Sequence, residues 1–205
     1  GDTVYIRGGT YYPMYGRYGN GTGPLDWKVG WAIEGEGLNG EYHYVQEGGD
    51  VRGIPDNYIT FQNYPGEEVI IDGQDYPAGT KTGNARGDGT STLILMVGAC
   101  YTRLKGLTIQ YSHHYGLAFT HWASYNLIED CKFIDCGYEN PNAGIGIGSS
   151  AAYNVIQNNY FKNKRENYGD PLHRADGVCL THYIGFKDWN WGPGSGTVVR
   201  WNTFE

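Results

Sequence analysis

Apolar residues recur at fixed positions in four segments of the chain. The segments begin at Leu104, Ile128, Ile156 and Val199, which lie 24, 28 and 43 residues apart. Each has Leu, Cys or Asn three residues later, and Ile or Phe two residues after that. Such alternation predicts strands with one buried face. We expect parallel strands, stacked in one sheet with the first and last apolar residues inward, over 104–109, 128–133, 156–161 and 199–204.

A second kind of strand alternates with the first. Three segments, at 116–119, 144–147 and 177–180, begin with Gly and then alternate apolar with small residues. Two kinds of strand that recur in a fixed order predict a chain wound into a repeating coil. The sequence therefore predicts an all-β fold, a right-handed parallel β-helix. A β-sandwich fits less well, because the Asn-Gly and Asp-Gly pairs do not separate strands of equal length. A propeller blade, at roughly 40 to 45 residues, exceeds the period.

The third position of the first pattern carries Leu107, Cys131, Asn159 and Asn202. Equivalent positions stack in a β-helix, and stacked Asn side chains can form a hydrogen-bonded ladder where the chain turns. We therefore expect an Asn ladder in this column. Cys131 can instead pair with Cys136, but we expect both to be buried free thiols, because free Cys packs as a small hydrophobic residue.

The rest of the chain fits one domain over 1–205. Further strands are expected at 3–6, 58–61, 69–71 and 93–97, and a loop or hairpin is expected as an insertion at about 11–50. Glu205 directly follows a predicted strand, and a solenoid needs its end covered. We therefore expect the N-terminal part of a longer β-helix, whose remaining coils, or a second fragment of the same β-helix, are its partner.

Composition narrows the choice of partner. The net charge of −7 disfavours nucleic acid, whose phosphates require a basic surface. No stretch approaches the roughly 20 apolar residues of a membrane span. The charges are uneven, because Lys162, Lys164, Arg165 and Arg174 fall within 13 residues. This basic strip is suited to an anionic ligand.

Two insertions, at 162–176 and 181–195, disturb the period most, and they flank the strand expected at 177–180. Loops that interrupt a rigid scaffold often carry function, so we expect the insertions to form a cleft. Carboxylates suit Ca²⁺, His suits proton transfer, and Trp suits the apolar face of a sugar. The candidates of these three kinds are Asp170, Asp176 and Asp188, His173 and His182, and Trp189 and Trp191.

Ala175-Asp176-Gly177, followed by an apolar strand, resembles the Asn-Ala-Asp-Gly-Phe turn of family-nine pectate lyases. Those right-handed β-helices cleave uronate polysaccharides by β-elimination, and the Asp of the turn binds a catalytic Ca²⁺. The resemblance implies that role for Asp176. Asp170, a carboxylate of the same insertion, is a second candidate ligand because Ca²⁺ prefers oxygen ligands. The sequence departs from that turn at both flanks, with Arg174 in place of Asn and Val178 in place of Phe.

The Tyr- and Gly-rich style of the chain and the run from Tyr183 to Gly196 resemble archaeal disaggregatases. Those secreted enzymes, similar in fold, break down a chondroitin-like acidic matrix polysaccharide. The resemblance implies a secreted protein whose partner is an acidic polysaccharide.

β-Elimination requires a base and a neutraliser of the uronate carboxylate. We expect His173 or Lys162 as the base and Arg174 as the neutraliser, with Ca²⁺ as a cofactor. Substrate contacts are expected from Lys164, Arg165, His182, Trp189 and Trp191. Two alternatives remain open. One is a glycoside hydrolase that uses two carboxyl groups about 5 to 9.5 Å apart, and the other is an adhesion solenoid that binds glycan without cleaving it.

Overall fold

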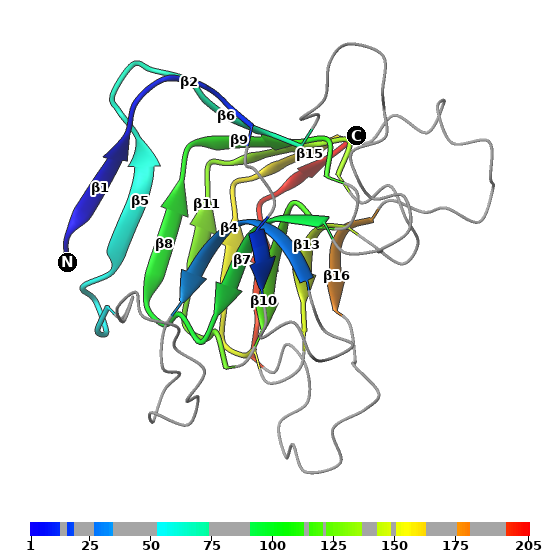
Figure 1. Ribbon diagram of the computed structural model, residues 1–205. Coiled ribbons are helices and arrows are strands. Elements are labelled where there is room, and N and C mark those ends of the chain that lie inside the picture. Colours follow the sequence, from blue (N-terminus) through cyan, green and yellow to red (C-terminus); the bar gives the residue numbers. More distant parts are fainter. Residues whose placement is uncertain are drawn as a thin grey trace.

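In the part of the chain that the computed structural model describes, three six-stranded sheets wind around one axis and enclose the apolar core (Figure 1). The strand order, in which each sheet takes every third strand through the middle of the chain, is that of a right-handed parallel β-helix. The structure describes residues 1–12, 16–18, 27–34, 53–73, 91–112, 115–120, 122–136, 143–148, 151–162, 176–180 and 196–205.

The sheets are named A, B and C, and their strands are given in spatial order. Sheet A contains β1 (Thr3–Ile6), β5 (Ile59–Asn63), β8 (Thr102–Lys105), β11 (Leu127–Glu129), β14 (Val155–Gln157) and β17 (Val198–Arg200). Sheet B contains β2 (Gly9–Tyr11), β6 (Val69–Asp72), β9 (Leu107–Gln110), β12 (Lys132–Ile134), β15 (Tyr160–Lys162) and β18 (Thr203–Phe204). Sheet C contains β3 (Gly16–Tyr18), β4 (Trp27–Glu34), β7 (Ser91–Val97), β10 (Leu117–Thr120), β13 (Ala143–Ile147) and β16 (Asp176–Leu180).

Each coil passes through sheets A, B and C in that order. The first coil is β1, β2 and β4, the third is β8, β9 and β10, and the fifth is β14, β15 and β16. The strands predicted over 3–6, 58–61, 69–71 and 93–97 are present as β1, β5, β6 and β7. Within the region where a loop or hairpin is expected, β3 pairs antiparallel with β4, which also pairs in parallel with β7.

The prediction that 104–109 and its equivalents stack in one sheet is wrong, although their parallel direction is confirmed. Each segment turns a corner, so its first half lies in sheet A and its second half in sheet B. The corner residues all have positive φ: 72° at Gly106, 54° at Asp130, 56° at Asn158 and 57° at Trp201. A single residue in this left-handed region redirects the chain, and Gly, Asn and Asp adopt it most readily.

The predicted inward positions are confirmed by the register of the strands. Leu104 pairs with Ile128, and Ile128 pairs with Ile156, in sheet A. In sheet B, Phe133 pairs with Phe161. These five side chains are at most 2 % exposed. Like residues therefore stack on like residues along the axis, which fills the core without helices.

The predicted Asn ladder is present at the corner between sheets A and B. The Asn159 side chain accepts a hydrogen bond from the Cys131 backbone N–H at 2.9 Å and donates one to Asn202 Oδ1 at 3.1 Å. A second ladder, which we did not predict, lies before sheet A. There Asn154 Oδ1 accepts from the Asn126 backbone N–H at 2.9 Å, and both side chains are buried. Both ladders satisfy backbone groups that leave the strands at corners.

Tyrosines form a further column at the corner between sheets C and A. Tyr101, Tyr125 and Tyr153 stack with ring centroids 5.1 and 5.0 Å apart and planes within 11° of parallel. All three have positive φ, of 51°, 58° and 55°. The stacked rings therefore support a strained corner in successive coils.

Cys131 and Cys136 are free and buried, as expected, and Cys100 is buried too. Each contacts backbone carbonyl oxygens; for example, Cys131 Sγ lies 3.3 Å from the Glu129 oxygen. Among the described residues, none belongs to a helix long and apolar enough to cross a membrane.

Candidate functional site

The fifth coil holds the two insertions between described strands. The first leaves sheet B after Lys162, the last residue of β15, and returns at Asp176, the first residue of β16. The second leaves after Leu180, the last residue of β16, and the described chain resumes at Gly196. Both insertions are therefore attached to one coil, at opposite ends of one strand of sheet C.

Backbone pairing fixes the place of Asp176. It lies opposite Ala143 at the start of sheet C, and the pairing continues from Ile145 opposite Val178 to Ile147 opposite Leu180. Asp176 thus stands at the point where the first insertion enters the sheet. The other residues proposed from the insertions lie outside the described residues: Lys164, Arg165, Asp170, His173, Arg174, His182, Asp188, Trp189 and Trp191. Their grouping into a cleft stays a prediction.

Lys162 is the one candidate whose side chain the structure describes. Its Nζ lies 3.2 Å from Glu205 Oε2, and the Tyr160 hydroxyl donates a 2.6 Å hydrogen bond to the same oxygen. The hydrogen bond to Glu205 raises the pKa of Lys162 above its ordinary value, with a smaller contribution from Tyr160. The side chain is 39 % exposed. In this arrangement Lys162 is a positively charged group at the end of β15, where the first insertion begins.

The same contacts shift the pKa of Glu205 in the opposite direction. Hydrogen bonds from Tyr160 and Lys162 lower the pKa of its carboxyl group. The pKa of Tyr160 is raised, chiefly by its hydrogen bond to Glu205. This exposed group of three joins β15 to the strand of the next coil.

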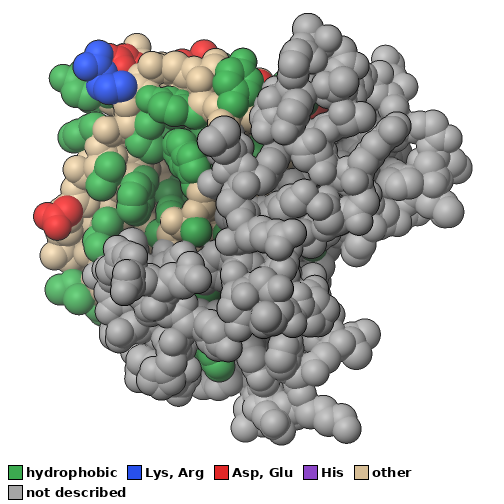
Figure 2. Space-filling view, in the orientation of Figure 1, with side chains coloured by type: hydrophobic (Ala, Val, Ile, Leu, Met, Phe, Trp, Pro, Cys, Tyr) green, Lys and Arg blue, Asp and Glu red, His purple; other side chains and the backbone are tan. Residues whose placement is uncertain are grey.

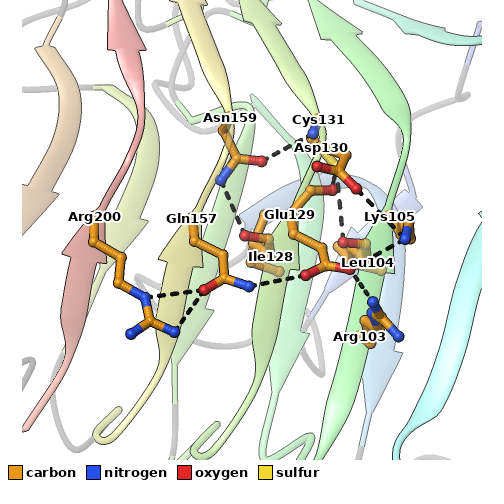
Figure 3. Close-up of polar contacts among 10 residues, drawn as sticks. All are labelled: Arg103, Leu104, Lys105, Ile128, Glu129, Asp130, Cys131, Gln157, Asn159 and Arg200. Carbon is orange, nitrogen blue, oxygen red and sulfur yellow. Dashed lines mark hydrogen bonds and ion pairs between the residues drawn. The ribbon is translucent and has the colours of Figure 1, made fainter.

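A charged ladder on the outer face of sheet A is the best described polar cluster, and sequence reasoning missed it (Figure 3). Glu129 is at its centre and only 5 % exposed. Arg103 forms an ion pair with Glu129, Lys105 Nζ lies 3.4 Å from it, and Gln157 Nε2 donates to it at 3.0 Å. Arg200 extends the row by donating to Gln157 Oε1 at 2.8 Å.

The electrostatics of the ladder keep Glu129 ionised. Burial by itself raises the pKa of Glu129, but hydrogen bonds from Arg103 and Gln157 and the nearby positive charges lower it by more. The net pKa therefore lies below the ordinary value. A carboxylate whose oxygens are occupied by three neighbours has little capacity left for a metal or a proton. We therefore interpret the ladder as a structural feature that holds four successive coils together.

The sequence did contain a signal for this ladder. Lys105, Glu129, Gln157 and Arg200 each directly follow the first apolar residue of the repeated pattern, and the register places them side by side. Neighbouring side chains of opposite charge, or of charge next to an amide, at one repeat position are expected to form stacked ion pairs and hydrogen bonds. The described residues contain no group of three or more His, Cys, Asp or Glu side chains that could hold a metal ion.

The family model described as right handed beta helix region matches residues 69–184, which is more than half of the chain. No curated protein matches the chain, and no solved structure does. The matched residues include the second Asn ladder, the first Asn ladder without Asn202, the charged ladder without Arg200, and the fifth coil up to the start of the second insertion. The right-handed β-helix is a fold common to carbohydrate-active enzymes and adhesins.

Proposed function

The chain belongs to the right-handed β-helix family, and on that premise we propose that it is a secreted enzyme that cleaves an acidic, uronate-containing polysaccharide by β-elimination. The observation that carries the proposal is the attachment of both insertions to the fifth coil. They leave from opposite ends of β16, a strand of only five residues, which spans about 17 Å. They also contain the chain's densest mixture of Asp, His, Lys, Arg and Trp.

The reaction assigns a role to each group. A base removes the proton next to the uronate carboxylate, the bond from the neighbouring ring carbon to the glycosidic oxygen breaks, and a carbon–carbon double bond forms. The leaving oxygen then takes up a proton. The proton is acidic enough to be lost only when positive charge lies on the carboxylate. This requirement explains why basic side chains and a cation site are proposed together.

Lys162 suits the carboxylate better than it suits the base. A base must be unprotonated, and the contacts with Glu205 and Tyr160 favour the protonated form by raising the pKa of Lys162. We therefore propose that Lys162 and Arg174 pair with the uronate carboxylate. His173, whose ordinary pKa is about 6.5, takes the proton. Lys164, Arg165, His182, Trp189 and Trp191 contact the glycan.

Ca²⁺ is proposed as the cofactor, held by Asp176 and Asp170. Carboxylate oxygens are ligands of the type that Ca²⁺ prefers, so the donor set fits a calcium ion. When bound, the ion supplies positive charge to the substrate carboxylate.

One experiment separates the three classes of function. The 205-residue chain is incubated with polygalacturonate or chondroitin, with added calcium or with a chelator. Ultraviolet absorbance from the new conjugated double bond supports a lyase. New reducing ends without that absorbance would show a hydrolase, which uses paired carboxyl groups. Retention on immobilised glycan with neither product would show an adhesion module. A neutral glucan serves as the control substrate.

A further inference from the structure

The outer face of sheet A has more cations than carboxylates. The outward side chains of β8, β11, β14 and β17 include Arg103, Lys105 and Arg200, and Glu129 is the one carboxylate among them. The chain as a whole, in contrast, has a net charge of −7. On the face shown in Figure 2, few charged side chains are visible among the described residues, and apolar ones predominate. The outer face of sheet A therefore differs in charge from the rest of the chain.

The cations of this face are more exposed than the carboxylate that they contact. The side chains of Arg103 and Lys105 are 33 % and 37 % exposed, and that of Glu129 is 7 % exposed. Arg200 is exposed and donates to the neutral amide of Gln157 (Figure 3). Asp130, at the corner beside the sheet, lies 3.5 Å from Lys105 and compensates part of the charge. The exposed atoms of the face are therefore mainly positively charged hydrogen-bond donors.

The tyrosine column runs beside these cations along the solenoid axis. Tyr101, Tyr125 and Tyr153 repeat at 5.1 and 5.0 Å, and Tyr58 meets Tyr101 edge to face at 6.1 Å. The pKa of Tyr58 is raised, chiefly by burial, and the charge of Arg103 opposes the shift. The tyrosine column therefore lies close to the cations. Because the stacked rings cover one another's faces, their rims are the parts that a ligand can contact.

A row of aliphatic side chains separates the tyrosine column from the charged ladder. Leu127 and Val155 pair in adjacent strands, and both are partly exposed. In the fourth coil, Leu127 follows Tyr125 by two residues and precedes Glu129 by two. The face thus offers apolar, hydroxyl-bearing and cationic side chains in parallel rows. This combination suits a charged sugar polymer, whose rings have apolar faces and whose rims carry hydroxyl and carboxylate groups.

We propose that the outer face of sheet A is a second binding surface for an acidic polysaccharide, which lies along the solenoid axis. The choice of polymer rests on the proposed function, whose site is anchored on β15 and β16. Arg103 and Lys105 bind carboxylates at the third coil, and Arg200 binds one at the sixth. The two positions are three strand spacings apart, or about 14 Å, so the ligand is an extended chain. Binding here keeps the polymer close to the insertions between cleavage events.

Electrophoresis through a gel that contains polygalacturonate, with a chelator present to prevent cleavage, measures binding separately from catalysis. We expect the polymer to retard the wild-type chain at low salt and to release it at about 1 M salt, where charges are screened. Lys105→Gln and Arg200→Gln should each weaken binding about threefold to fivefold. Lys132→Gln removes the same charge from the outer face of sheet B, so it is the matched control and should bind like the wild type.

The length of the ligand provides a second test. A uronate disaccharide is too short to join the third and sixth coils, so it should compete with the polymer far more weakly than a longer oligosaccharide. The proposal is overturned if the polymer does not retard the wild type, if both sheet A variants bind like the wild type, if Lys132→Gln loses as much affinity, or if the disaccharide competes equally. Unchanged melting temperatures confirm that the variants fold. If the expected binding pattern holds but no unsaturated product forms with calcium, the proposed function fails and this binding surface stands.

Discussion

Phe133 and Phe161 lie ring over ring in adjacent coils, with centroids 5.0 Å apart and planes 10° from parallel. Phe204 continues the column at the same spacing from Phe161. The environment changes along it, because Phe133 is 1 % exposed and Phe204 is 56 % exposed. The same column thus contains one Phe side chain that is buried and another that is exposed to solvent.

This difference predicts unequal losses of stability. Phe133→Ala leaves a cavity between coils and should lower the free energy of unfolding by about 3–5 kcal/mol. Phe161→Ala should cost nearly as much, but Phe204→Ala only about 1 kcal/mol, since solvent already reaches that ring. Urea titration of the three variants measures the losses. Equal losses at Phe133 and Phe204 would mean that the column does not form the core as described.

The Asn ladder should also be sensitive to substitution. Asn159→Ala leaves the Cys131 backbone N–H and the Ile128 carbonyl without their side-chain partner. An unsatisfied buried group costs about 1–3 kcal/mol, so we expect a loss of at least about 2 kcal/mol in urea titration. Lys132→Ala, on an exposed side chain nearby, is the control and should change stability by less than about 0.5 kcal/mol. A similarly small effect at Asn159 would contradict the ladder's role.

The charged ladder predicts a dependence of stability on pH. Because the folded pKa of Glu129 is lowered, its contribution is present above the unfolded pKa of about 4.3 and is lost as the pH falls through the folded pKa. Glu129→Gln should lower the unfolding free energy by about 1.5–3 kcal/mol at neutral pH. The gap between wild type and variant should narrow below about pH 4.

Glu68 provides the matched control for Glu129. Its carboxylate is exposed and lies 3.8 Å from Lys132, so Glu68→Gln should change stability by less than about 0.5 kcal/mol at any pH. Urea titrations across the pH range measure both variants. A gap for Glu129→Gln that does not vary with pH would show that the carboxylate is not held ionised by the ladder.

The buried thiols should resist alkylation. Burial raises the pKa of Cys131 to about 12 and that of Cys136 to about 11, and only the thiolate is reactive. Iodoacetamide at about pH 8 should therefore leave both unlabelled in the native chain and label both after unfolding in urea. Peptide mapping by mass spectrometry locates the label. Rapid native labelling of either thiol would contradict its burial.

The sequence predicted the stacked columns because every coil repeats the same apolar spacing. It did not predict the division into two sheets, because one corner residue with positive φ is enough to turn the chain. Asp130 and Asn158 are typical of such a position, but Trp201 is not, so residue type alone did not mark the corner. The second ladder was missed because Asn126 and Asn154 precede the repeated apolar pattern, which therefore does not mark them.

For the candidate site, the sequence predicted only where the two insertions attach to the coil. The disturbed period located the insertions, and the structure attaches both to β16. The roles of His173, Arg174 and the Trp residues could not be predicted from the repeat, because these residues lie in the insertions that interrupt it. Lys162 shows the difficulty: its neighbour Glu205 lies 43 residues away in sequence and comes close only because the next coil stacks on β15.

The most direct test of the proposed function is the rate at which unsaturated uronate product forms in the presence of calcium, compared between wild type and Asp176→Asn. Asp2→Asn, on the first coil, is the control. We predict that the wild type and the control form product at equal rates. Asp176→Asn should be slower by on the order of a hundredfold or more and should lose the calcium-dependent rise in melting temperature. Equal rates and equal melting shifts in all three proteins would contradict the placement of the site at the start of β16.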